Sequence, residues 1–409
     1  MKTPFTNFTA LDVGSSKISI LAAKIQANGE ARIGYQGIFQ SSGIIAGVIN
    51  DFKAAEQSLV NAIYTLEKEV DKNINSVSIS ISGIGTKSFY IYQKIRLPAG
   101  RVTKSDVQVL TEKAMEQFSN LNQTIIHYLP IEYTLDMNNS INNPIGMFGN
   151  VLGCRFHVVV ADSCNITNIV NCFAKYNIKI SEIVVGVYAA SMAVLTEDEK
   201  ALGSIVIDFG ASTTSFAIFV GGQLIYTGFI PFGGNSITSD IAKILGISMS
   251  SAEKLKVLYG STVESASYND TMINLAEIDS SSNLDEDSNI TSSDLSMIIR
   301  ARVEEMIELV KEEYDKVGVD HLISRRIILT GGGSMMRGIK EVVGSCFNKQ
   351  VRIGHALNIP GFENDHTASS YTSSIGLLKY EMIKQKKLSR FVPDSGKFLS
   401  KISGWFKEN

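Results

Sequence analysis

Short hydrophobic runs flank a small polar turn in two regions of this chain, and each region predicts a β-hairpin. Residues 205–219 (IVIDFGASTTSFAIF) place β-prone residues on either side of a turn that begins with Asp208 and contains Gly210. Residues 11–20 (LDVGSSKISI) repeat this pattern, with Asp12 and Gly14 at the corresponding places. Two copies of one hairpin, roughly 195 positions apart, indicate an internal duplication.

Between and after these hairpins, apolar residues recur with a helical period or alternate as in strands. The segment 77–82 (VSISIS) alternates strictly, whereas 52–69 gathers Phe52, Ala55 and Leu59 on one helical face. A hairpin followed by a helix and a strand is typical of an α/β half-domain. The expected helices are 52–69, 104–118, 166–175, 187–195, 237–245, 250–259, 297–317, 336–347 and 371–385, and the further strands 89–97, 124–135, 154–160, 180–184, 223–231, 325–329 and 351–353.

Two segments interrupt this rhythm. Residues 83–162 predict a self-contained α+β unit inside the first half. Residues 262–296 contain eight acidic residues and no lysine or arginine, which favours an exposed, loop-rich excursion. We also expect an acidic turn at 197–200 and a helix 237–245 that is capped by Asn235 or Ser236.

Composition excludes several classes of protein. A chain of 409 residues is expected to form more than one domain. Its 38 basic and 41 acidic residues give a net charge of -3, so no nucleic-acid partner is expected. Four cysteines without a CxxC pair and five scattered histidines predict reduced thiols and no standard metal site. We expect neither a signal peptide nor a membrane-spanning helix, because no apolar run approaches about 20 residues.

The two hairpin turns have the chemistry of phosphate sites. Gly210 permits a bend in which successive amide groups point into one concavity, and Asp208 could hold Mg²⁺ or its water beside bound phosphate. Such glycine-rich hairpins are also common as plain turns. A third glycine-rich turn, TGGGSM at 330–335, lies between a predicted strand and helix. Neither a P-loop motif nor a Rossmann GxGxxG after the first strand is found.

Five motifs occur together in this chain: LDVGSSK, IDFGAST, VYAASMAVL, LTGGGSMM and YTSSIGLL. VYAASMAVL lies before IDFGAST along the chain. As a set they resemble the nucleotide-site motifs of the actin-like ATPase superfamily. The chain is most similar to the FtsA family of bacterial cell-division proteins, over essentially its whole length. This resemblance implies an α/β, duplicated actin-like (ribonuclease-H-like) fold with two halves around a nucleotide cleft. The first half would comprise 1–82, 163–196 and 361–388, with the inserted subdomain 83–162. The second half would comprise 197–245 and 323–360, with a second inserted subdomain 246–322. Residues 389–409 would form a linker and a membrane-targeting helix.

The resemblance also implies a site for ATP and Mg²⁺. Asp12 and Asp208 would organise the metal and water, and Lys17 would reach the β- or γ-phosphate, the alternative for Lys17 being a solvated surface lysine. Glu253 and Lys256 would contact ribose and base, or form an ordinary charged helix face. The remaining implied nucleotide-binding residues are Gly14, Ser15, Ser16, Gly210, Ala211, Ser212, Thr213 and Gly234 near the phosphates, and Gly331, Gly332, Gly333 and Ser334 along the adenosine.

Two departures from hydrolytic relatives predict slow hydrolysis. Ser212 stands where those relatives have a second glycine, and Gly186 stands where chaperone ATPases of the superfamily have a glutamate. Loss of a positioned base typically lowers a rate by ~10²–10⁴-fold. No catalytic residue is therefore assigned beyond the metal and water role of Asp12 and Asp208. The chain is expected to be a weak ATPase at most.

The C-terminal segment predicts an amphipathic helix. Residues 384–409 hold seven basic and two acidic residues. Such a short helix is marginal alone in water and should fold on a surface, either an anionic membrane or a groove on this chain or a partner. The resemblance implies the membrane. The expected membrane contacts are Phe398, Leu399, Ile402, Trp405 and Phe406 on the apolar face, flanked by Lys397 and Lys401.

The function implied by the resemblance is structural. Such a protein would self-assemble on the inner face of the cytoplasmic membrane at the division septum, tether the tubulin-like FtsZ and help to recruit downstream division proteins. The FtsZ C-terminal tail would bind the subdomain 246–322, where Arg300 and Arg302 are candidate contacts or parts of an ordinary charged face. The alternatives are a sugar or acetate kinase of the same superfamily, and an MreB-like or pilus-assembly homologue.

Overall fold

Two five-stranded sheets with the same topology form the body of the computed structural model. The model describes residues 6–390, apart from 27, 84, 119–121, 137, 264–270, 280–287, 324–325, 357–358 and 363–367. In each sheet three sequential strands form an antiparallel meander. A later strand pairs in parallel with the first strand of the meander, and a fifth strand pairs in parallel with that one. The predicted duplication is therefore present as two sheets of equal construction.

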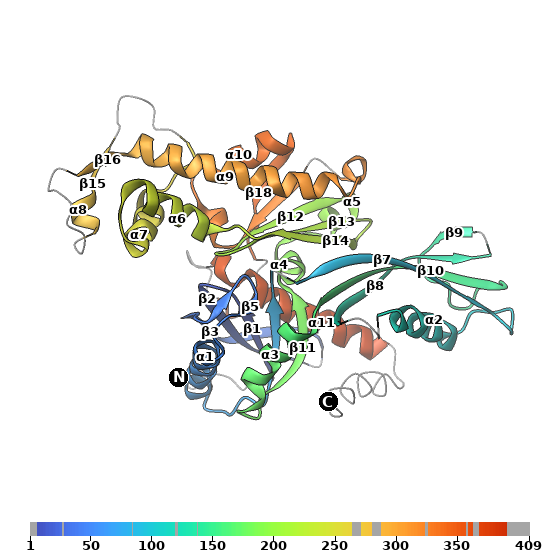
Figure 1. Cartoon of the computed structure of the whole chain (residues 1–409). Coiled ribbons are helices and arrows are strands. Elements are labelled where there is room, and N and C mark those ends of the chain that lie inside the picture. The colour runs from blue at the N-terminus through green and yellow to red at the C-terminus, as the bar shows by residue number, and fades with distance from the viewer. Residues whose placement is uncertain are drawn as a thin grey trace.

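The first sheet has the order β11-β6-β1-β2-β3 and the second the order β14-β13-β12-β17-β18. Figure 1 shows the two sheets one above the other, with helices α4 and α11 between them. The strands of the first sheet are β1 (Phe8–Val13), β2 (Lys17–Ile25), β3 (Ala31–Gln40), β6 (Ser76–Ile81) and β11 (Lys179–Val185). Those of the second are β12 (Ser204–Phe209), β13 (Thr214–Val220), β14 (Gln223–Ile230), β17 (Arg326–Thr330) and β18 (Gln350–Ile353).

The helices between the sheets are rich in small residues. Helix α4 (Gly186–Val194) is buried along almost its whole length and packs against α11 (Thr372–Arg390). A shared core of buried residues from both sheets surrounds this pair. The first half is completed by α1 (Phe52–Val70), α3 (Ser163–Ala174) and the two-residue strands β4 (Ile44–Ile45) and β5 (Val48–Ile49).

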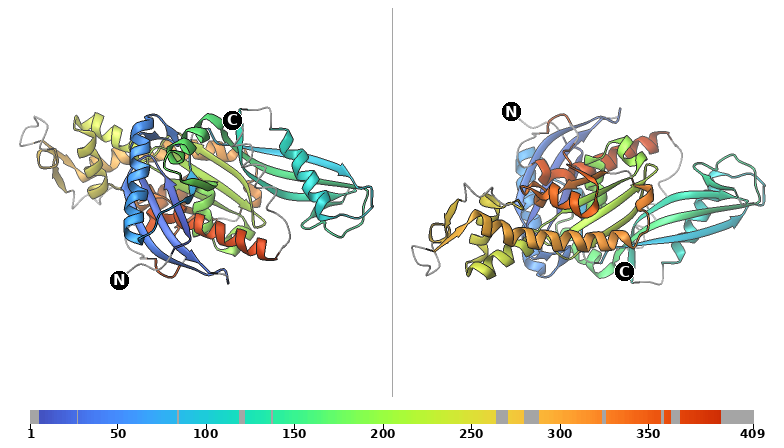
Figure 2. Two further views of the ribbon diagram at one scale, coloured as in Figure 1. Left: turned by 90° about the horizontal axis from the view of Figure 1, so that it is seen from below. Right: turned by 90° about the horizontal axis from the view of Figure 1, so that it is seen from above.

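The unit that was predicted at 83–162 is a separate sheet. It has the order β7-β10-β8-β9, and helix α2 covers one face over a core of its own. In the two views of Figure 2 this unit projects from one end of the molecule, while the hairpin β15–β16 lies at the other end. Its elements are β7 (Lys87–Arg96), α2 (Lys104–Glu116), β8 (Gln123–Leu135), β9 (Asn138–Ile141) and β10 (Val151–Asp162).

The second half carries most of the remaining helices. They are α5 (Glu197–Leu202), α6 (Gly234–Leu245), α7 (Met249–Tyr259), α8 (Leu275–Ile278), α9 (Ser292–Asp315) and α10 (Ile339–Phe347), with the hairpin β15 (Met272–Asn274) and β16 (Asn289–Thr291). Short 3₁₀ turns occur at η1 (Asp320–Leu322), η2 (Gly332–Met335) and η3 (Ala368–Tyr371). No described helix is both long and apolar enough to cross a bilayer.

Several local predictions were wrong. The expected acidic turn at 197–200 is helix α5, because Thr196 and Glu199 form a capping box. The predicted caps Asn235 and Ser236 lie inside α6, whose N-cap is Gly233 without a side-chain bond. The helix expected at 336–347 begins at Ile339, after the 3₁₀ turn η2 and Gly338 in the left-handed region.

The acidic excursion is more ordered than predicted in its described parts. Strands β15 and β16 pair with each other, and Ile273, Leu275 and Ile290 are buried in the core of the second half. Helix α9 begins at Ser292 rather than at 297, because Thr291 caps it by accepting a hydrogen bond from the Asp294 amide. The expected solvated loop is thus interrupted by a packed hairpin.

Candidate functional site

The two duplicated hairpin turns form equivalent structures at the ends of their sheets. In the first turn the Gly14 amide donates to the Lys17 carbonyl at 3.1 Å, and in the second the Gly210 amide donates to the Thr213 carbonyl at 2.9 Å. A Cβ atom on either glycine would lie 2.7–2.8 Å from that carbonyl oxygen. Only glycine fits this close approach of backbone to backbone.

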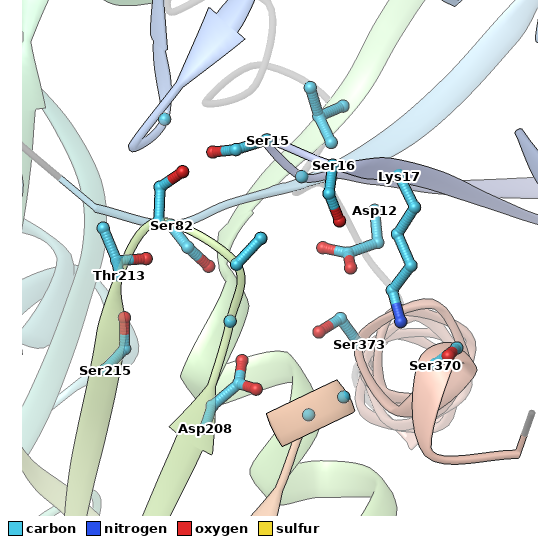
Figure 3. Close-up of a pocket in the computed structure, with 18 of the residues that line it drawn as sticks. Asp12, Ser15, Ser16, Lys17, Ser82, Asp208, Thr213, Ser215, Ser370 and Ser373 are labelled. Carbon is cyan, nitrogen blue, oxygen red and sulfur yellow. The ribbon is translucent and has the colours of Figure 1, made fainter. Parts of the chain in front are cut away.

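A cavity that opens to solvent lies between these turns. Figure 3 shows Asp12 and Lys17 entering it from the first half and Asp208 from the second. Its walls are almost entirely glycine, serine, threonine and aspartate. The lining residues are Asp12, Val13, Gly14, Ser15, Ser16, Lys17, Gly47, Ser82, Asp208, Gly210, Ala211, Ser212, Thr213, Ser215, Gly331, Gly332, Ser369, Ser370, Thr372 and Ser373.

The two carboxylates occupy matching places, because each is the last residue but one of the first strand of its sheet. Asp12 pairs with Ser80 of β6, and Asp208 pairs with Thr330 of β17, in parallel register. Ser80 also donates a hydrogen bond of 2.7 Å to Asp12 Oδ1. Duplication of the strand order thus brings two acids to opposite walls of one cavity.

The protonation of these groups reflects their crowding. Burial, and then the charge of Asp12, raises the pKa of Asp208 to about 7, while Lys17 acts in the opposite direction. Burial also raises the pKa of Asp12, against the hydrogen bond from Ser80 and the charge of Lys17. Burial lowers the pKa of Lys17, against the attraction of both carboxylates. One lysine does not balance two acids here, so the cavity favours an added cation.

The donor set fits magnesium held together with phosphate. Within the described residues no group of three or more His, Cys, Asp or Glu side chains is placed to hold a metal by itself. Mg²⁺ is usually held by one or two carboxylates together with substrate phosphates and waters. Asp12 and Asp208, beside amide-rich turns, are the residues that would hold it.

The third glycine-rich turn closes the cavity with bare backbone. Gly331 has φ 81°, and a Cβ atom there would lie 2.2 Å from Asp208 Oδ1 and 2.6 Å from the Phe209 carbonyl oxygen. Gly331 is therefore required both by its conformation and by its neighbours. A Cβ atom on Gly332 would lie 3.8 Å from Lys17 Nζ, so this turn faces the lysine of the other half.

Family models match this chain in two places. The model "Cell division protein FtsA" matches residues 205–376, and the model "SHS2 domain inserted in FTSA" matches residues 83–160. The Cell division protein FtsA of Borreliella burgdorferi is 32% identical over 408 residues, which cover 97% of each chain. This chain belongs to the FtsA family. The FtsA of Agrobacterium fabrum is 28% identical, covering 98% of this chain and 94% of the relative, and that of Escherichia coli K12 is 28% identical, covering 97% of both.

Solved structures show that the fold is the actin-like ATPase fold. The PilM–PilN type IV pilus biogenesis complex matches with a TM-score of 0.65 at 14% identity, covering 93% of this chain and 99% of the other. MreB5 of Spiroplasma citri bound to ADP matches with a TM-score of 0.54 at 16% identity, covering 94% and 98%. Membership of the FtsA family and this fold confirm the resemblance that the sequence motifs predicted.

Some residues that were predicted to bind nucleotide in this FtsA family member lie behind the cavity. Lys256 Nζ donates to Glu253 at 2.6 Å, to Thr238 at 2.8 Å and to the Gly234 carbonyl at 3.1 Å. This cluster joins α7 to α6, directly behind the second hairpin turn, where the Gly234 amide donates to Gly210. Glu253, Lys256 and Gly234 are thus outside the cavity lining. Gly234 nevertheless contacts the second hairpin turn, which forms part of that lining.

Gly333 and Ser334 also lie outside the cavity lining. A Cβ atom on Gly333 would meet the Phe209 side chain at 2.8 Å, and the buried Ser334 hydroxyl donates to the Gly331 carbonyl at 2.7 Å. Both residues shape the turn that presents Gly331 and Gly332. Of the four predicted adenosine contacts, Gly331 and Gly332 line the cavity, whereas Gly333 and Ser334 support the turn.

The position of the missing carboxylate is filled by a hydroxyl. Helix α4 begins at Gly186, one residue before the predicted start, and has no acidic residue in its first turn. A Cβ atom on Gly186 would lie 2.0 Å from Ser82 Oγ. Ser82 lines the cavity at the end of β6. A glutamate at 186 would therefore require Ser82 to move.

Sequence reasoning missed several cavity residues. Ser82 and Ser215 follow or lie within strands, Ser369 and Ser370 come from η3, and Thr372 and Ser373 come from the first turn of α11. The motif YTSSIGLL contained a signal for Thr372 and Ser373, since small hydroxylated residues open a predicted helix there. Their approach to the turns depends on tertiary structure.

The predicted partner contacts on α9 are engaged within the chain. Arg302 pairs with Asp240 of α6 and, at 2.6 Å, with Glu305, and Arg300 pairs with Glu304 at 2.7 Å. Arg300 is half-exposed and could exchange this neighbour for another acid. The predicted membrane residues between 397 and 406 lie outside the described residues.

Proposed function

We propose that this FtsA family member binds ATP with Mg²⁺ between the two duplicated turns and hydrolyses it slowly. The observation that carries this proposal is the meeting of Asp12, Lys17 and Asp208 in one cavity walled by backbone amides and hydroxyls. MreB5 of Spiroplasma citri, which shares the fold, was solved with ADP and with AMPPNP. We extend that ligand class to this chain.

Different residues of the site would bind the phosphates and the magnesium ion. The turn amides at Gly14–Lys17 and Gly210–Thr213 would hold phosphate oxygens, as backbone nests do. Lys17 would add a charged contact, and Asp12 and Asp208 would hold Mg²⁺, which supplies positive charge to the phosphates. Because α4 opens without a carboxylate, an attacking water would have no strong base beside it at Gly186.

Nucleotide would act mainly on assembly. Its phosphates would touch turns of both halves, so bound nucleotide would favour the conformation in which the halves are close together. We propose that this form self-assembles on the inner face of the cytoplasmic membrane through the segment 389–409. There it would tether FtsZ at the septum and help to recruit downstream division proteins. The relatives named as cell division proteins support this role.

The subdomain 246–322 offers a surface for the acidic tail of FtsZ. Helix α7 exposes Val257 by 70% and Leu258 by 68%, an unusual exposure for large apolar residues. Arg300 is half-exposed on the neighbouring helix α9. An apolar patch with a basic residue near it suits a peptide that combines hydrophobic and acidic residues.

Nucleotide binding and turnover test the proposal most directly. We expect ATP to bind in the presence of Mg²⁺, and K17A to weaken it by about tenfold or more, because a charged hydrogen bond contributes about 1.5–3 kcal/mol. Calorimetry on the full chain gives the affinities. The matched control is K24A, which removes an exposed lysine from the same strand β2 and should leave the affinity unchanged.

The rate of hydrolysis decides between the proposed role and the kinase alternative. We expect turnover far below the ~1–100 per second of kinases. Turnover in that range, or phosphoryl transfer to a sugar or acetate acceptor, would refute the slow-ATPase role. Equal ATP affinities of wild type, K17A and K24A would place the nucleotide elsewhere.

A further inference from the structure

The start of α11 forms a wall of the cavity in which the sequence analysis, although it named the motif YTSSIGLL, assigned no nucleotide-binding residue. Ser370 belongs to the 3₁₀ turn η3, and Ser373 lies in the first turn of the 19-residue helix α11. Both line the cavity. Lys17 lines the same cavity, and Figure 3 shows the Ser373 hydroxyl directed into it.

Ser373 is buried and its hydroxyl is not used by the protein. Only 5% of the residue is exposed, and its hydroxyl makes no hydrogen bond with any residue in the described part of the chain. The oxygen itself is not enclosed by protein but opens into the cavity. It is therefore free to form a hydrogen bond with a ligand atom there.

The neighbouring hydroxyls have a different task, since they attach the helix to both halves. Thr372 donates to the Ser369 carbonyl at 3.1 Å and lies 3.0 Å from Thr330 of β17, in the second half. Ser374 is hydrogen-bonded to Ser19 of β2, in the first half, at 2.7 Å. The contacts of Thr372 with Thr330 and of Ser374 with Ser19 are buried. Ser373 is consequently held at a defined place between the halves.

The surroundings of Ser373 favour an anion that arrives with its own cation. Lys17 and the first amides of a long helix bring positive charge to this wall. Asp12 and Asp208 face it and would repel a bare anion, but they would attract an anion that carries a divalent metal. A phosphate group with bound Mg²⁺ satisfies both conditions.

We propose that the Ser373 hydroxyl, with Ser370 on the other side of Lys17, binds the terminal phosphate of the nucleoside triphosphate. This inference rests on the proposed ATP function and adds to it a specific contact. A diphosphate lacks the group that Ser373 binds. The start of α11 therefore distinguishes the triphosphate from the diphosphate, and the helix itself is the element that registers the difference.

The test compares the affinities of the full chain for AMPPNP and for ADP, both with Mg²⁺. We expect S373A to weaken AMPPNP by about tenfold and ADP by less than about twofold, since a hydrogen bond to a charged phosphate is lost only from the triphosphate. S370A, at a half-exposed position, should change the ratio of affinities in the same direction. The matched control is S374A, which removes the adjacent hydroxyl from Ser19 and should leave the ratio unchanged.

The outcomes separate this inference from the proposed function. Wild type that binds both nucleotides, together with unchanged ratios in S373A and S370A, would overturn the role of Ser373 alone. Equal weakening of AMPPNP and ADP by S373A would also overturn it. Wild type that binds neither nucleotide would overturn the proposed function and the role of Ser373 with it. Thermal unfolding without nucleotide shows that each variant is folded.

Discussion

Arg352 joins the edge of the second sheet to the connection between the halves. Its guanidinium group donates to both carboxylate oxygens of Glu199, at 2.8 and 2.6 Å, and to the Val194 carbonyl at 2.8 Å. The Arg352 hydrogen bonds, with a further bond from the Thr196 amide, lower the pKa of Glu199 to about 2, against the effect of burial. A single arginine thereby fastens β18, α5 and the end of α4.

Glu199 should make the stability of the fold depend on acid pH. Its pKa is lower in the folded chain than the ordinary 4.5, so its contribution is complete above about pH 4.5 and disappears as the pH falls toward 2. E199Q should lower the free energy of unfolding by about 1–3 kcal/mol at neutral pH and remove this part of the pH dependence. Denaturant unfolding at several pH values measures both effects.

The control for this substitution lies on the same helix. Glu197 pairs with Lys200, but 89% of its side chain is exposed. E197Q should change stability by less than about 1 kcal/mol, as for other exposed pairs. If E199Q lost no more stability than E197Q, or kept the wild-type pH dependence, the assigned role of Arg352 would be wrong.

At the residue scale, local signals predicted one part of the site and not the other. Asp12, Lys17 and Asp208 were identified because each belongs to a short turn that is visible in the sequence. Ser82 and Ser373 come from a strand end and a helix start that only the folded chain brings to those turns. Glu253, whose predicted contact with the nucleotide stays a prediction, does not line this cavity and is hydrogen-bonded to Thr238 of α6 and to Lys256.

At the scale of elements, the crossing of α4 and α11 depends on one glycine. A Cβ atom on Gly376 would lie 1.7 Å from the Ala189 carbonyl oxygen and 2.2 Å from its carbon. The two helix backbones are therefore in direct contact. No rearrangement of a flexible side chain could make room, because the obstructing atoms belong to the backbone of a fully buried helix.

G376A should force the two helices apart. We expect a loss of about 1–3 kcal/mol in the free energy of unfolding, as for other overpacked cores, together with weaker nucleotide binding because Ser373 lies one turn earlier on α11. Denaturant unfolding and calorimetry measure the two effects. G344A is the matched control, since its Cβ atom would lie 3.4 Å or more from its neighbours and alanine favours helix by about 1 kcal/mol. Equal stability of the two variants would contradict the close crossing.

Element existence was easier to predict than element ends. The strands and helices of both halves were expected from periodicity, which depends on burial of one face. The ends depend on capping and on turns of three or four residues. Helix α6 begins after Gly233, α10 begins after Gly338, and α5 begins at the capping box of Thr196, and none of these starts was predicted. The hairpin β15–β16 was missed because its strands are three residues each, too short for a periodic signal.

At the scale of the whole molecule, the inserted unit is attached to both halves through two buried histidines. His157 lies 3.2 Å from the Leu224 carbonyl of β14 and 3.1 Å from Ser88, whereas His127 accepts a hydrogen bond from the Val185 amide that precedes α4. Burial lowers the pKa of His127 to about 3 and of His157 to about 4. Both are neutral near pH 7, as these contacts require, and the unit connects the halves on the side opposite the β15–β16 hairpin.

The proposed membrane role depends on the segment after the described residues. W405E with F406E should abolish sedimentation of the full chain with anionic liposomes, because two of five large side chains, at about 1.5 kcal/mol each, no longer favour the bilayer. FtsZ should then remain in the supernatant as well. The control S400A with S403A changes the opposite face of the predicted helix and should sediment as wild type does. Unchanged sedimentation of the first variant would assign the segment to a protein groove.

The overall architecture was predictable because it repeats. Two copies of a hairpin implied two similar sheets, and a break in the rhythm at 83–162 implied an inserted unit, which the structure and the SHS2 model both contain. How the parts sit together was not predictable. Arg352 and Glu199 are 153 positions apart, and His127 and Val185 are 58 apart. Because such partners are distant in the sequence, no local pattern predicts their contacts.

Helix α11 has a consequence for communication along the chain. It begins at a wall of the cavity and ends at Arg390, directly before the segment that is proposed to bind the membrane. Nineteen helical residues extend about 28 Å and bend little. If the helix tilts as a rigid body about its start near Ser373, its far end moves much further than Ser373 does. The occupancy of the nucleotide site would thus change the position of the segment that is proposed to bind the membrane.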